Sequence, residues 1–189
     1  MSPPVPDAAL LAALARLVRG LSALFWGLPV ALVICVQTAK GDWLRPLGIL
    51  PPVAATGLLF YGLTLLGAFQ RQERIWIAAL DRARICALVA VGLSPFLFWW
   101  NRLPNHAFYL LSVELLVFNG LVLLLLLNRV LRRLVAMLPD ETLRLETRLF
   151  TTINRYFLVI SICILAGYLG LMRIQSIPHR FIDFLVVLN

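Results

Sequence analysis

Charged residues are scarce in this sequence, and acidic residues are scarcer than basic ones. Of the 189 residues, 14% are charged and 61% are hydrophobic, and only nine are Asp or Glu. Soluble domains average about 25% charged and about 45–50% apolar residues. The composition therefore argues against a soluble domain and indicates a chain that spends most of its length in lipid.

Cysteines, histidines and catalytic motifs are also in short supply. Cys35, Cys86 and Cys163 stand in or beside apolar runs, without a CxxC pair or metal-ligand spacing, which predicts buried thiols and no disulfide or redox site. The sequence contains no P-loop, GxSxG, HExxH or Rossmann fingerprint. We expect neither catalysis nor a metal site, and no cofactor bound by this chain alone.

Lysine occurs once and arginine sixteen times, giving a formal net charge of +8. A basic chain can bind nucleic acid, but this needs a basic face on a soluble domain, so we expect no nucleic acid among the partners. We expect the arginines to hold the protein against anionic lipid. Abundant Arg, Ala, Leu and Pro with little Lys is typical of GC-rich bacterial genomes and favours a bacterial inner membrane.

Five stretches reach the roughly 17–25 mostly apolar residues with which a helix crosses a bilayer. The predicted fold is therefore all-α, a polytopic transmembrane bundle of about five spans in a single domain, 1–189. Pro29 and Pro95 are expected to kink the first and third spans, and whether the short third span is a full crossing stays open. The predicted spans lie near residues 21–39, 50–69, 85–100, 108–127 and 156–172.

The basic residues are distributed unevenly between the two sides of the predicted bundle. Twelve fall in the N-terminal segment, the second loop and the fourth loop, whereas five fall on the other side. Because basic loops stay in the cytoplasm, we predict a cytoplasmic N-terminus and a periplasmic C-terminus. Trp76 and Tyr156 then mark the cytoplasmic interface, and Trp99 and Trp100 the outer one.

Two segments outside the spans keep apolar residues at helical spacing. Residues 128–155 do so on both sides of Pro139 and Asp140, which predicts a cytoplasmic helical hairpin between spans four and five. Residues 177–189 place Phe181, Phe184, Leu185 and Leu188 on one face. This pattern predicts an amphipathic tail lying on the outer leaflet.

Glu114 is the only acidic residue well inside a predicted span. A carboxylate in the membrane is costly and is by default a functional candidate, with Asn119 as a possible polar neighbour. Alternatively, Glu114 pairs with an arginine of another helix or stays protonated. His106 and His179 both fall on the outer side and can approach each other and Glu114, but no motif supports a haem or metal ligand role.

Arg129, Arg132 and Arg133 directly follow the fourth span. Such a cluster sets topology while touching anionic lipid, or it docks an acidic surface of a partner. Gly167 and Gly170 give the fifth span a small-residue face of the kind that contacts other helices.

Two functions are consistent with this pattern. The first is a non-catalytic structural or assembly subunit of a larger inner-membrane complex, for example a respiratory, photosynthetic or secretory one. The alternative is a small oligomeric transporter or channel that uses Glu114. The expected partners are membrane lipid and either other membrane-protein subunits or further copies of the chain.

Overall fold

The computed structural model describes the backbone of residues 8–67, 74–136 and 141–187, and within these ranges the side chains of residues 11–172 except position 143. All regular elements in the described ranges are helical, so the all-α prediction is confirmed. They are α1 (Ala8–Lys40), the 3-10 turn η1 (Arg45–Leu47), α2 (Leu50–Leu66), α3 (Arg74–Leu93), α4 (Phe96–Arg102), α5 (Ala107–Ala136) and α6 (Glu141–Val187).

Four helical segments are long and apolar enough to cross a membrane, namely Leu11–Lys40, Arg74–Arg102, Ala107–Ala136 and Arg144–Met172. At 1.5 Å per residue each is about 45 Å long, which exceeds the roughly 30 Å of the hydrocarbon core. The chain is therefore an integral membrane protein. The remaining predicted span coincides with α2, which is apolar but has only 17 residues.

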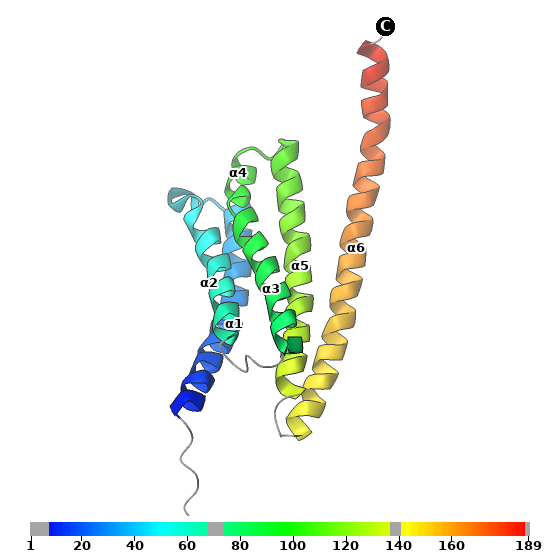
Figure 1. The fold of residues 1–189 in the computed structure, drawn as a ribbon. Helices are drawn as coiled ribbons and strands as arrows, with labels where there is room; N and C mark the ends of the chain where they lie inside the picture. The colour runs from blue at the N-terminus through cyan, green and yellow to red at the C-terminus, as the bar shows by residue number, and fades with distance from the viewer. Residues whose placement is uncertain (1–7, 68–73, 137–140, 188–189) are drawn as a thin grey trace, which may run out of the picture.

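The long helices run in alternating directions (Figure 1). As a result, the start of α1, the end of α2, the start of α3, the end of α5 and the start of α6 lie toward the same end of the molecule. Helix α2 packs along α1, α3 lies between α2 and α5, and α6 packs chiefly against α5. The connecting residues 68–73 and 137–140, with the predicted turn at Pro139 and Asp140, lie outside the described residues.

Helices α1 and α2 approach each other closely through two glycines. A Cβ atom on Gly20 would lie 2.9 Å from the carbonyl oxygen of Gly62, and one on Gly62 would lie 3.1 Å from Leu24 Cγ. Small residues at such a crossing let helix backbones pack tightly in lipid. The pair therefore tolerates no larger side chain at either glycine without moving apart.

The main core lies between α1, α2, α3 and α5, and its largest fully buried side chain is Trp76. The sequence predicts that Trp76 marks the cytoplasmic interface of the membrane. In the structure its side chain is completely buried within the bundle, at 0% exposure. It joins a cluster that includes Leu63 and Leu66 of α2 and Val130 of α5. Trp76 is thus a packing residue of the bundle.

Proline affects the two helices in different ways. Pro29 lies inside α1, which continues through it to Lys40. Pro95 separates α3 from α4, and the adjoining Ser94 is fully buried, with its hydroxyl donating to the carbonyl of Val91 at 2.9 Å. The sequence predicts a kink at Pro95, and in the structure α3 ends at Leu93 and α4 begins at Phe96.

Arg84 joins α3 to the end of α2. Its Nε atom donates to the carbonyl of Leu63 at 3.3 Å and its Nη2 atom to that of Thr64 at 3.2 Å, while Nη1 pairs with Asp81 Oδ1 at 3.0 Å. The last carbonyls of a helix have no partner within the helix, so a guanidinium is well suited to them. Arg84 therefore caps α2 from the neighbouring helix.

Helix α6 continues without interruption through the region where the sequence predicts a fifth span followed by a separate tail. It extends from Glu141 to Val187, and the side chains of 177–189, including that of His179, lie outside the described residues. The placement of this tail on the outer leaflet stays a prediction.

Candidate functional site

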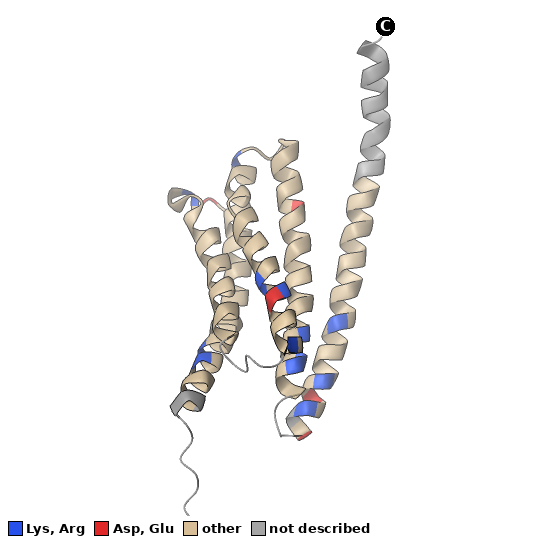
Figure 2. Ribbon diagram, in the orientation of Figure 1, with Lys and Arg blue, Asp and Glu red and all other residues tan. Residues whose placement is uncertain are grey.

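Basic residues collect toward the end of the molecule where α5 meets α6 (Figure 2). Among the described residues, the positions coloured as charged at the end of α5 and the start of α6 are mostly Lys or Arg, and the opposite ends of α1 to α5 carry few such positions. This distribution follows from the alternating directions of the helices, which bring the arginine-rich segments of the sequence to one end.

A buried hydrogen bond fixes α5 against α6 near this end. Asn128 is 6% exposed, and its Nδ2 atom donates to the carbonyl of Thr151 at 2.7 Å. The hydroxyl of Thr151 donates to the carbonyl of Arg148 at 3.2 Å. Leu134 on α5 and Leu158 on α6 are also buried. The arginines at the ends of the two helices are thus held at a short distance from one another.

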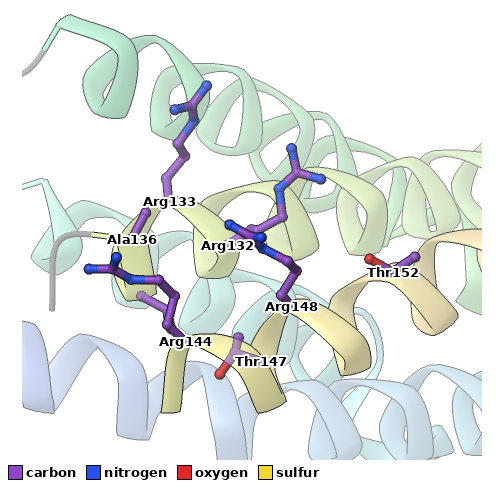
Figure 3. Close-up of a pocket in the computed structure, with 8 residues that line it drawn as sticks. Arg132, Arg133, Ala136, Arg144, Thr147, Arg148 and Thr152 are labelled. Carbon is purple, nitrogen blue, oxygen red and sulfur yellow. The ribbon is translucent and has the colours of Figure 1, made fainter. Parts of the chain in front are cut away.

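A cavity of about 420 Å³ lies between these two helix ends (Figure 3). Four arginines and two threonines dominate the described part of its wall, which contains no carboxylate. The Arg148 side chain extends from α6 toward α5 and Arg132. The lining residues are Arg132, Arg133, Val135 and Ala136 of α5 and Arg144, Thr147, Arg148 and Thr152 of α6.

The spacing of these residues explains why they share one wall. Arg144, Arg148 and Thr152 are successive i, i+4 positions, which lie on one face of a helix. The described part of the cavity wall therefore presents several guanidinium groups, which can bind an anion.

The structure brings together two of the three arginines singled out in the sequence. Arg132 and Arg133 line the cavity, whereas Arg129 is exposed and is not among its lining residues. The sequence identifies Arg144 and Arg148 only as basic residues of the fourth loop and not as site residues. Their i, i+4 spacing was the available signal, although their partners on α5 follow only from the contact between the helices.

Asn119 has a different role from the one considered for it. Its Nδ2 atom donates to the carbonyl of Cys86 at 2.9 Å, and the Cys86 thiol donates to Asn119 Oδ1 at 2.9 Å. Five residues at 3.6 per turn place Asn119 and Glu114 on different faces of α5. Asn119 thus joins α5 to α3, and Glu114 remains a half-buried carboxylate nearer the start of α5.

His106 is exposed immediately before α5. Its carbonyl accepts the backbone N–H groups of Tyr109 and Leu110 at 3.1 and 3.2 Å, and its ring lies 4.9 Å from that of Tyr109. Eight residues of helix place it about 12 Å along the axis from Glu114. No group of three or more potential metal ligands is found in the described part of the chain.

Comparisons with known proteins find no relative of this chain: no family model matches it, and no curated protein and no solved structure is similar to it. Its function must therefore be inferred from the arrangement of its own helices and side chains.

Proposed function

We propose that this chain is a non-catalytic structural or assembly subunit of a larger bacterial inner-membrane complex, and that α6 makes its contact with the other subunits. The observation that supports this most is the isolation of α6. Only 6% of its most apolar stretch is buried within the chain, compared with 39% in Arg74–Arg102. Figure 1 shows α6 leaving the rest of the bundle above its contact with α5.

The uncovered part of α6 carries a surface suited to another helix. From Val159 to Met172 no side chain is buried, and a Cβ atom added to Gly167 or Gly170 would meet nothing within 4 Å. At the comparable glycines of α1 and α2, Gly20 and Gly62, atoms of the other helix occupy the space beside the glycine. We therefore propose that a transmembrane helix of another subunit packs against the glycine face of α6.

The proposed topology has five crossings, in which α2 is the shortest. Its 17 residues correspond to about 26 Å and reach the lower limit for a span. The basic end of the bundle then faces the cytoplasm, with the N-terminus on the same side. In this arrangement the ends of α5 and α6 form a cytoplasmic helical hairpin, and the C-terminus is periplasmic.

Replacing both Gly167 and Gly170 with leucine is expected to remove the partner subunit without weakening the fold. Leucine at these positions blocks close approach by another helix, whereas the added Cβ atoms meet no described atom of another part of the chain within 4 Å. The measurement is the ratio of partner to chain after purification in a mild detergent, together with the thermal stability of the chain itself.

Gly120→Leu is the matched control, because a Cβ atom added to Gly120 on α5 also meets nothing within 4 Å. The control should keep the partner in its wild-type ratio. Unchanged copurification of the Gly167 and Gly170 double variant would show that this face of α6 is not the contact.

The alternative function, a small oligomeric transporter or channel, rests on the half-buried carboxylate of Glu114. If the subunit proposal holds, Glu114→Gln should leave the complex assembled and the purified chain should move no ions in liposomes. Ion flux that is present in the wild-type chain and abolished by Glu114→Gln would favour the alternative.

A further inference from the structure

The cavity between α5 and α6 has the chemistry of a phosphate site. Arginine presents a planar fork of donors that matches phosphate oxygens, and four arginines line this one cavity together with the hydroxyls of Thr147 and Thr152. Its volume of about 420 Å³ lies within the roughly 300–1,000 Å³ typical of small-molecule pockets. The cavity is therefore suited to an anionic group of about the size of a phosphate or a lipid headgroup.

The depth of the cavity indicates where such a ligand comes from. The first 21 residues of α5, 107–127, contain a single charged residue, Glu114, and at 1.5 Å per residue they span about 31 Å, close to the hydrocarbon thickness. Arg132 then lies about 7.5 Å beyond Leu127. The headgroup layer extends roughly 5–8 Å beyond the hydrocarbon on each side. With residues 107–127 across the hydrocarbon, Arg132 in the cavity wall lies at the level of lipid phosphates.

An apolar surface continues from the cavity along α6. Steps of four and three residues from Thr152 lead to Tyr156 and Val159 on the same helix face, and these side chains are 59% and 44% exposed. A phosphate held by the arginines would place an attached acyl chain beside them. This continuity favours a lipid over a water-soluble phosphate.

We propose that the cavity binds the phosphate group of an anionic phospholipid from the leaflet at the basic end of the bundle. The guanidinium groups of Arg132 and Arg148 contact the phosphate from α5 and α6, and an acyl chain lies along Tyr156 and Val159. The bound lipid bridges Arg132 of α5 and Arg148 of α6 and fixes the two helix ends against each other. The site does not depend on the partner subunit proposed above.

The test is binding of phosphatidylglycerol to the purified full chain in a neutral detergent, measured by native mass spectrometry as the lipid is titrated. The double variant Arg132→Ala, Arg148→Ala is expected to bind about thirtyfold more weakly, at about 1 kcal/mol for each lost arginine. The control is Arg82→Ala, Arg129→Ala, which removes the same charge from positions outside the cavity and should bind nearly as well as the wild type. Arg132→Lys, Arg148→Lys should recover part of the affinity.

Four outcomes would overturn the proposal. An equal loss of binding in the cavity and control variants, or equal binding of phosphatidylcholine, would show that the lipid responds only to overall charge or to the apolar surface. Displacement of phosphatidylglycerol by millimolar inorganic phosphate would identify a site for free phosphate. Binding of an acidic peptide, without binding of phosphatidylglycerol, would identify a docking site for a protein partner.

Discussion

Replacing Trp76 with alanine is expected to lower the free energy of unfolding of the chain by about 3 kcal/mol. Trp76 is fully buried at the start of α3, in the cluster that joins α2 to α5. In lipid the helices gain little from the hydrophobic effect when they associate, so close packing carries much of the stability. Truncation leaves a large cavity whose lining loses its van der Waals contacts.

The stability can be measured by titration with a denaturing detergent in mixed micelles. Trp26→Ala is the matched control, because Trp26 on α1 is 66% exposed, and it should change the stability little. The Trp76→Phe variant separates the stability lost with the packing of the ring from the stability lost with the indole N–H group. The Nε1 atom of Trp76 is buried without an acceptor among the described residues, so phenylalanine should cost much less than alanine. Equal losses for Trp76→Ala and Trp26→Ala would contradict the buried position.

Replacing Arg84 with alanine is expected to destabilise the chain by about 2 kcal/mol, since hydrogen bonds to a charged group contribute about 1.5–3 kcal/mol. The substitution removes the donors to the carbonyls of Leu63 and Thr64 and the partner of Asp81. The Arg84 side chain is 28% exposed, and water reaching the freed carbonyls limits the loss. Arg82→Ala, which removes a charge from a less buried position on the same helix, should have little effect.

Gly67 provides a second test of the same contact. A Cβ atom at this position would fall against the Arg84 guanidinium, so Gly67→Ala should displace Arg84 and destabilise the chain as well. Both substitutions remove the same contact between Arg84 and the end of α2. Their effects on the free energy of unfolding should therefore not add. Gly67→Ala introduced into the Arg84→Ala variant should cost much less than in the wild type. Full additivity would mean that Arg84 does not cap α2.

The helices were predictable from the sequence because long apolar runs identify them, but the start of α3 was not. The sequence predicts a third span from residue 85, whereas α3 begins at Arg74. Asp81, Arg82 and Arg84 look like loop charges when only hydropathy is considered. They fit on a helix because Arg84 bonds to α2 and to Asp81, and the contact with α2 forms only when the helices pack.

The candidate site was predictable only in part, for a similar reason. Arg132 and Arg133 stand out in the sequence because they follow a long apolar run. Arg144 and Arg148 join them through the Asn128–Thr151 contact between α5 and α6, which links residues far apart in the sequence. Asn119 is a possible polar neighbour of Glu114 by sequence proximity, whereas its bonds to Cys86 depend on the packing of α5 against α3.

The most direct test of α6 as an interface is site-specific photocrosslinking in native membranes. A photoreactive residue replaces Ile164 of α6, which is 66% exposed, or Ile85 of α3, which is 64% exposed. We expect one protein adduct of defined mass from position 164, formed with a subunit that also copurifies stoichiometrically, and only lipid adducts from position 85. Lipid adducts alone from both positions, with the chain purifying by itself, would contradict it.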